Sequence, residues 1–141
     1  MSIKTEIENY LIRSYKLNYS DEIIYHPVKI VQSVKSLIGI NPEIPNKKLL
    51  EFIPKYLSSF KKNESQNDEI VQVEYFASMI NLEILLKEKK YSEAKTEIIR
   101  LLQVSTGEPI LELIILIHLH NIHVLPFLNS IYRAVKFCNG K

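Results

Sequence analysis

A nearly continuous apolar segment, residues 110–128, constrains the fold of this chain more than any other feature. Its sequence is ILELIILIHLHNIHVLPFL, which also contains one glutamate, one asparagine and three histidines. A run of this hydropathy is stable in water only when other elements cover most of it. We therefore expect residues 110–128 to form a buried central helix, with its polar side chains shielded from bulk water.

The same segment has nearly the length of a transmembrane helix, but its composition argues against that role. A helix needs about 20 apolar residues to cross a bilayer. Glu112, Asn121, Pro126 and the three histidines interrupt this segment. An acid near the bilayer centre alone costs about 2.5–3.5 kcal/mol. We therefore predict a soluble helix and no association with a membrane.

Two further features of the chain predict its compartment. The N-terminus, MSIKTEIENYLIRSYK, alternates charged and apolar residues and has no signal-peptide core. The single cysteine, Cys138, cannot form an internal disulfide, which fits a reducing compartment. We expect a cytoplasmic protein.

Apolar residues recur at helical spacing, and no long alternating stretch suggests a half-buried strand. The chain has only 3 glycines, too few for the tight turns of an all-β fold. None of these glycines is close enough to another to build a phosphate-binding loop. At 141 residues the chain fits one domain with its own core. We predict a single all-α domain that covers residues 1–141. It should form a compact bundle of about six or seven helices, which could be arranged as stacked antiparallel hairpins.

Capping residues and prolines set the expected helix boundaries. Pro27 and Gly39 bracket one helix, Pro54 predicts a kink or a restart, and Asn67 or Asp68 is a good N-cap for a later helix. The expected helices cover approximately residues 3–15, 27–38, 49–60, 69–89, 91–104, 109–120 and 127–137.

Residues 75–104, YFASMINLEILLKEKKYSEAKTEIIRLLQV, resemble a helical hairpin of the tetratricopeptide type, with YSEA starting the second helix. The aromatic and glycine signature of that repeat's first helix is missing, and no second copy recurs at its 34-residue period. The resemblance therefore implies a hairpin of two antiparallel helices and does not place the chain in that family.

The three histidines of the apolar segment are the sharpest candidates for chemistry, because imidazole binds transition metals and acts as a base near neutral pH. At about 100° per residue, His120 and His123 lie about 60° apart, on one helix face. His118 points about 160° from His120 and about 140° from His123. All three converge only if the chain turns near Asn121. The spacing matches no standard ligand motif, so we expect hydrogen-bonded histidines at the core boundary and no metal.

Several other titratable residues lie in apolar surroundings. Glu74, Glu83 and Glu112 occur inside strongly apolar segments, and Lys87 lies four residues after Glu83. We expect ion pairing for such acids, because unpaired buried acids are costly. His26 is expected to be a turn residue. Cys138 has no local signature of a catalytic thiol.

The first half of the chain combines basic residues with tyrosines. Residues 1–62 hold ten Lys/Arg against six Asp/Glu, whereas residues 63–141 hold eight against ten. Aromatic side chains beside cations can stack on bases and hold phosphates. Most of these cations are lysines, however, and no recognition motif for nucleic acid is present. The aromatic residues concerned are Tyr10, Tyr15, Tyr19, Tyr25 and Tyr56.

The sequence thus favours a non-enzymatic interaction or regulatory module, an adaptor or small inhibitor that binds a protein partner, with a homodimer as one form of partnership. We expect no catalytic residue, cofactor or metal. One alternative is a metal-dependent or histidine-based enzyme that uses His118, His120 and His123. The other is a weak nucleic-acid binder that uses the basic, tyrosine-rich first half.

Overall fold

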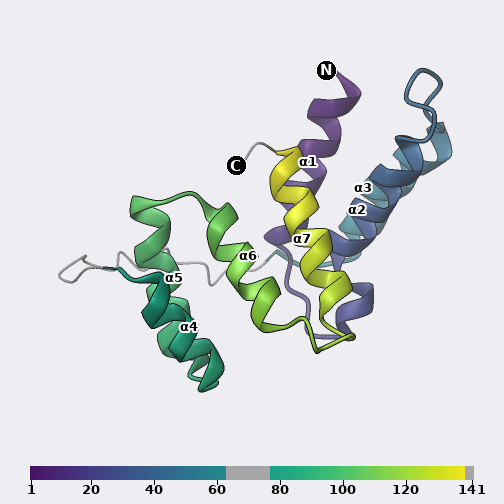
Figure 1. The fold of residues 1–141 in the computed structure, drawn as a ribbon. Helices are drawn as coiled ribbons and strands as arrows, with labels where there is room; N and C mark the ends of the chain where they lie inside the picture. Colours follow the sequence, from purple (N-terminus) through teal and green to yellow (C-terminus); the bar gives the residue numbers. More distant parts are fainter. Residues whose placement is uncertain (63–76, 139–141) are drawn as a thin grey trace.

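The computed structural model describes residues 1–62 and 77–138, which form seven α-helices and one short 3₁₀-helix (Figure 1). No sheet forms in this part of the chain, where a lone β-bridge joins Leu17 and Lys62. The predicted all-α bundle of about six or seven helices is confirmed. The elements are α1 (Ile3–Tyr15), η1 (Ile23–Tyr25), α2 (Pro27–Ile38), α3 (Lys47–Ser58), α4 (Met79–Lys87), α5 (Tyr91–Val104), α6 (Gly107–Ile117) and α7 (Leu125–Phe137).

Side-chain caps start four of these helices. Ser2 accepts the Thr5 N–H at the start of α1, and Asn46 accepts two backbone N–H groups at the start of α3. The remaining two capping residues are His26 for α2 and Ser78 for α4. Each cap satisfies backbone donors that the first turn of a helix leaves unpaired. The helices therefore begin where the local sequence provides an acceptor.

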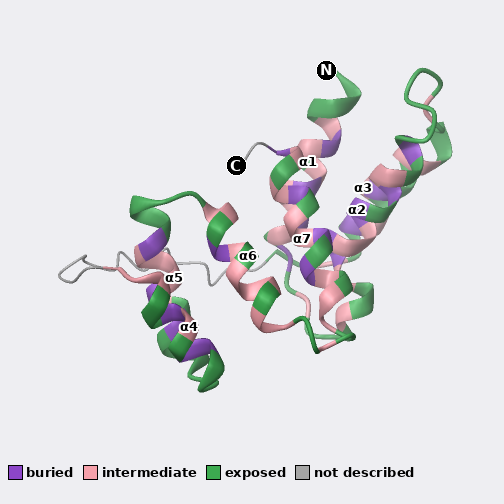
Figure 2. Ribbon diagram, viewed as in Figure 1, coloured by how far each residue is buried: buried purple, intermediate pink, exposed green. Residues whose placement is uncertain are grey.

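The buried apolar residues form two separate clusters, visible as two groups of buried segments in Figure 2. The first lies among α1, α2, α3 and α7. The second lies among α4, α5 and α6 and is smaller. The first cluster contains Ile7, Leu11, Leu17, Val28, Val31, Val34, Ile38, Ile53, Leu57, Ala134 and Cys138. The second contains Leu82, Leu85, Leu86, Ala94, Leu101 and Ile110.

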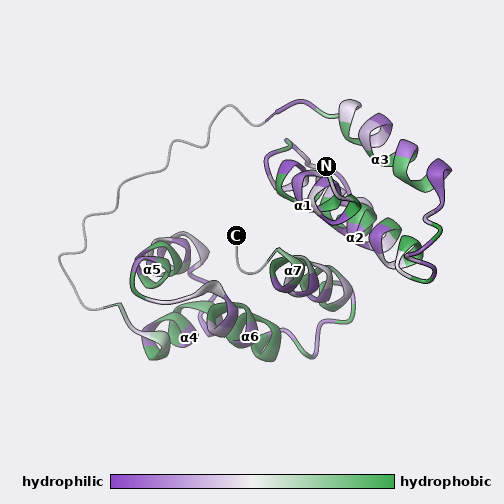
Figure 3. Ribbon diagram, turned by 90° about the horizontal axis from the view of Figure 1, so that it is seen from above, coloured by the Kyte–Doolittle hydropathy of each residue, from purple (hydrophilic) through white to green (hydrophobic). Residues whose placement is uncertain are grey.

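Packing between α6 and α7 connects the two clusters. Glu108 at the start of α6 forms an ion pair with Lys136 at the end of α7. One turn further along α6, Glu112 accepts a hydrogen bond from the Tyr132 hydroxyl at 3.4 Å. These pairings run in opposite directions along the two helices, so α6 and α7 form an antiparallel hairpin. Figure 3 shows α7 between α6 and the helices of the first cluster.

The apolar segment 110–128 divides into α6, a turn region at 118–124 and the start of α7. The interruption between the expected helices 109–120 and 127–137 is therefore present, but the segment is not buried as expected. Only its two ends, Ile110 and Leu128, are buried. The expectation of burial is therefore wrong, because α6 faces the second cluster on one side and solvent on the other. Leu116 and Ile122 have 64% and 73% of their surface exposed.

Two smaller expectations are also corrected. Helix α4 begins at Met79 and not at residue 69, since Ser78 is extended and caps it. The two capping positions that the sequence suggested, 67 and 68, lie outside the described residues. Helix α3 continues through Pro54, so no restart occurs there. The inner face of α2 buries Gln32, and Leu37 on the same helix is exposed.

None of the helices in the described residues is long and apolar enough to cross a bilayer. Helix α6, the most apolar of them, has 11 residues, about half the length that a transmembrane helix needs. The expectation that segment 110–128 is not a membrane span agrees with this division into two helices.

Candidate functional site

His118 terminates α6 and uses its ring to do so. Its backbone N–H donates to the carbonyls of Ile114 and Ile115, and its Nδ1 lies 2.7 Å from the Ile114 carbonyl oxygen. A carbonyl only accepts hydrogen bonds, so Nδ1 must carry the proton. His118 is thus the hydrogen-bonded boundary residue that the sequence predicts.

Asn121 organises the turn region that follows. Its N–H donates to the His118 carbonyl, and its side-chain oxygen accepts the His123 N–H at 3.2 Å. Asparagine favours such turns because its side chain competes with the helical backbone for donors. The helix therefore breaks near Asn121, where a turn was the condition for the three histidines to converge.

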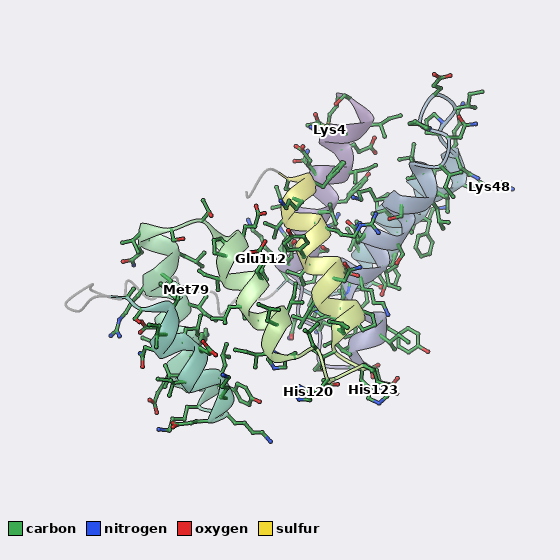
Figure 4. All side chains as sticks on the ribbon, in the orientation of Figure 1. Lys4, Lys48, Met79, Glu112, His120 and His123 are labelled. Atoms are coloured by element: carbon green, nitrogen blue, oxygen red, sulfur yellow. The ribbon has the colours of Figure 1, made fainter. Side chains whose placement is uncertain are left out.

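The break does not bring the histidines together. His120 and His123 are exposed and point away from the helices at the α6–α7 connection (Figure 4). Over the described ranges, 1–62 and 77–138, no three residues among histidine, cysteine, aspartate and glutamate are arranged to hold a metal ion. The chemistry expected of a His118, His120 and His123 cluster has no geometric support there.

The acids and the cysteine also have structural partners. Glu83 forms the predicted ion pair with Lys87, with 2.5 Å between oxygen and nitrogen. Glu112 bonds to Tyr132, as described above. Cys138 is buried in the first cluster, which gives a substrate no access to its thiol. Glu74 lies outside the described residues.

The tyrosines of the first half are largely occupied by contacts within the protein. Tyr56 donates to the Tyr25 carbonyl at 2.9 Å, and the Tyr19 ring packs edge-on against His26. Burial raises the pKa of Tyr15 to about 12. Of the five tyrosines, Tyr25 alone is exposed, and one exposed ring is not the row of open aromatic faces on which successive bases stack.

His26 proves to be a capping residue with two aromatic neighbours. Its Nδ1 accepts the Val28 N–H at 3.3 Å, and its ring packs edge-on against Tyr19 and Phe127. Burial lowers the pKa of His26 below its ordinary value of 6.5. Protonation of Nδ1 would also remove the acceptor, because both ring nitrogens of the imidazolium are donors.

We expect His26 to make the fold less stable in mild acid. Its folded-state pKa lies below the unfolded value, so its contribution is complete above about pH 6.5 and is lost as the pH falls through the folded pKa. His26→Asn keeps a capping acceptor without titrating in this range. Chemical denaturation at pH 7.5 and 5.0 should show a smaller stability difference for this variant than for the wild type. An equal difference would assign the acid sensitivity to other groups.

A hollow of about 550 Å³ lies where α6 ends beside the turn between α4 and α5. That turn is a Schellman motif: Lys89 has φ 58°, its N–H donates to the Leu86 carbonyl, and the Lys90 N–H donates to the Leu85 carbonyl. The motif directs the chain from α4 into α5. The hollow is lined by Leu86, Lys87, Lys89, Tyr91, Leu116, Ile117, His118, His120 and Asn121.

Four large, exposed apolar or aromatic residues lie at this hollow or directly beside its lining residues in the chain. Tyr91 and Leu116 line it, while Leu119 and Ile122 follow in the turn region after α6. We call these four residues the α6-end surface. Single exposed apolar residues are common, but a group beside a hollow is typical of binding surfaces. The α6-end surface is exposed because the apolar sequence continues beyond the residues of α6 that pack against the second cluster.

Comparison with known proteins does not add to this geometry: no family model, no curated protein and no solved structure matches the chain.

Two buried polar residues that the sequence analysis did not single out have distinctive positions. Glu97 on α5 is 3% exposed, and Gln32 on α2 is 2% exposed. Each could have been noticed from its spacing. Glu97 lies three residues after Ala94 and four before Leu101, and Gln32 lies four after Val28, so both fall on the buried stripe of their helix.

Proposed function

We propose that this protein is a non-enzymatic interaction module, an adaptor or small inhibitor, that binds a partner protein at the α6-end surface. The observation that carries this proposal is that the exposed Tyr91 and Leu116 line one hollow, while the exposed Leu119 and Ile122 neighbour its lining residues in the chain. Burying apolar area of this kind gives about 25 cal/mol per Å². Tyrosine is one of the residue types that most often anchor protein interfaces, and the aliphatic side chains add apolar area beside Tyr91.

The charges around the hollow indicate the chemistry of the partner segment. Its lining includes two lysines and two histidines but no carboxylate. Lys87 is paired with Glu83 on its own helix, so Lys89 contributes the positive charge without that compensation. Complementarity then favours a segment that places acidic residues beside apolar anchors. An amphipathic helix with an acidic polar face meets both requirements, because it presents apolar side chains at helical spacing to a groove.

The competing hypotheses have weaker support. A histidine-based enzyme requires ligands or bases that act together, and the exposed His120 and His123 do not share a pocket with an acid. A nucleic-acid binder requires open aromatic faces, whereas several tyrosines contact neighbouring residues. A second copy of this chain is the remaining alternative occupant of the α6-end surface.

We expect Leu116→Glu and Ile122→Glu each to weaken partner binding at least tenfold. A carboxylate introduced into an apolar contact loses the anchor and must be desolvated. The matched control is Leu102→Glu, which makes the same change at an exposed leucine of α5 outside the hollow. Partners recovered from the source organism with the three variants are compared quantitatively, and affinities are then measured by calorimetry.

The control separates binding from folding. All three residues are at least half exposed, so each variant should keep its stability within about 0.5 kcal/mol. If a partner is lost with Leu102→Glu as readily as with Leu116→Glu, the proposed surface is wrong. Sedimentation tests whether a second copy of this chain occupies the surface instead. If the wild type is a dimer and Ile122→Glu is a monomer, the α6-end surface is a self-association surface.

A further inference from the structure

A hollow of about 500 Å³ lies at one end of the first cluster, where α1 begins and where α2 and α7 end (Figure 1). Helices α2 and α7 run in the same direction, since His26 packs against Phe127 at their starts and the Lys35 ammonium lies 4.3 Å from the centroid of the Phe137 ring at their ends. The volume falls within the range of about 300–1,000 Å³ that ligand pockets occupy. We call this space the α1–α7 hollow.

Apolar side chains form the bottom and part of the rim of the α1–α7 hollow. Ile7 and Ile38 are 4% and 5% exposed, so they close the bottom. Ile3 is 37% exposed and Phe137 is only partly buried, so both offer apolar surface that a ligand can reach. The hollow can therefore cover an apolar chain.

Three cations line the same hollow, with no acid beside them among the described residues: Lys4, Lys35 and Arg133. Lys4 is partly compensated by Glu8 at 3.9 Å on its own helix. Neither Lys35 nor Arg133 forms an ion pair with an acid of the described residues. The hollow thus combines apolar walls with two uncompensated positive charges.

Lys35 joins the apolar and the charged parts of the hollow. Its side chain is partly buried, and its ammonium lies over the Phe137 ring. Burial lowers the pKa of Lys35, and the charge of the neighbouring Arg133 lowers it further. An anion between the two cations would offset this repulsion, because a nearby opposite charge favours the charged form of each.

The hydroxyl group in the lining does not compete for this anion. Ser36 donates its hydroxyl proton to the Gln32 carbonyl at 3.0 Å. The donors that the lining side chains offer to a ligand are therefore ammonium and guanidinium groups. Such donors favour an anionic acceptor over a neutral one, because charge-assisted hydrogen bonds are about twice as strong.

We propose that the α1–α7 hollow binds a single-chain amphipathic carboxylate, an aliphatic acid of medium chain length. Its carboxylate lies between Lys35 and Arg133, whose guanidinium matches the planar geometry of a carboxylate. Its chain lies against Ile3 and Phe137. A peptide would bring backbone groups that need partners, whereas an aliphatic chain needs only apolar contact. This site lies on the first cluster and does not depend on the α6-end surface.

Octanoate below its micelle concentration is the probe, and the isoleucine methyl resonances of the full chain report binding. We expect saturable shifts for Ile3 and Ile38 and none for Ile80, which is exposed on α4. Each buried methylene contributes about fourfold in affinity, so butanoate should bind at least about tenfold more weakly. The uncharged 1-octanol should bind about fivefold more weakly than octanoate, because it cannot pair with the cations.

Lys35→Met and Arg133→Met should each weaken octanoate binding about threefold, and together about tenfold. Lys35 also stabilises the end of α2, since it lies in the last turn, so the melting temperature of each variant is measured. Arg133 is exposed, and its variant should fold whatever the effect at Lys35. Both variants should keep the 1-octanol affinity of the wild type, which shows that the hollow is intact. The matched control is Lys29→Met on α2 outside this hollow, and it should leave octanoate binding unchanged.

Four results would overturn the proposal. The first is that octanoate gives no saturable shift at Ile3 and Ile38. The second is that 1-octanol or butanoate binds as tightly as octanoate, because the hollow would then recognise only a chain or only a charge. The third is that Arg133→Met binds octanoate as tightly as the wild type does. The fourth is sedimentation with phosphatidylglycerol vesicles that excess octanoate does not reduce, which would assign these cations to a membrane surface.

Discussion

Replacing Leu82 by alanine is expected to unfold α4, α5 and α6 locally while α1, α2 and α3 remain folded. Leu82 is completely buried and belongs to the second cluster, to which the described part of the chain contributes six buried residues. A leucine-to-alanine change in a core costs about 2–5 kcal/mol. A core this small rarely supplies more than about 3–5 kcal/mol. The loss is therefore comparable with the whole stability of that half.

Hydrogen exchange followed by mass spectrometry measures this effect segment by segment. Amides of α4–α6 should exchange much faster in Leu82→Ala, whereas those of α1 and α2 should keep most of their protection. The matched control is Leu102→Ala, because Leu102 belongs to the same half but is 50% exposed; we expect it to cost less than about 1 kcal/mol. If α1 and α2 lose protection as fully as α4 does, the two clusters unfold as one cooperative unit and the expectation is wrong.

The helix boundaries were predictable wherever the local sequence contains both a residue that favours a helix start and one that favours a helix end. Pro27 and Gly39 bracket α2 within one residue of the expected ends. Caps and apolar spacing are local properties, so a single sequence suffices to locate them. The start of α4 shows the limit of this method. Ser78 caps α4 and also donates its backbone N–H to Glu97, which lies nineteen residues away and is not part of the local pattern.

The position of segment 110–128 was not predictable, because hydropathy does not show how many neighbours a helix will have. Burial on all sides requires partners on all sides, and the main neighbours of α6 among the described elements are α4, α5 and α7. The sequence did indicate the turn at Asn121 as the feature that decides the histidine geometry. It could not show that the turn directs His120 and His123 into solvent.

The candidate binding residues and the buried Gln32 also differ in how much of their environment the sequence predicts. Leu116 and Ile122 are apolar residues of an apolar run, and only the fold distinguishes them from core residues. Gln32 lies on a buried stripe, so its burial was predictable, but the sequence does not show that no described residue pairs with its amide. Sites formed between distant segments require the packing that a sequence pattern does not contain.

Glu97→Ala should destabilise the fold by about 2–4 kcal/mol, from the cost of leaving buried or charged partners unpaired. The Glu97 carboxylate is 3% exposed, and its Oε1 accepts the Ser78 N–H at 2.7 Å. Its Oε2 lies 3.5 Å from Arg100. The carboxylate therefore joins the start of α4 to α5. Alanine removes the acceptor for both donors and leaves a cavity between the helices.

Two further substitutions identify which property of Glu97 matters. Glu97→Gln keeps an acceptor for the Ser78 N–H but loses the charge, so it should cost only about 1 kcal/mol, the difference between a charged and a neutral hydrogen bond. Glu51→Ala makes the same truncation at an exposed site of α3 and should stay within about 0.5 kcal/mol. Stability is measured by chemical denaturation. Equal losses for Glu97→Ala and Glu97→Gln would mean that the charge paired with Arg100, and not the bond to Ser78, holds the start of α4 in place.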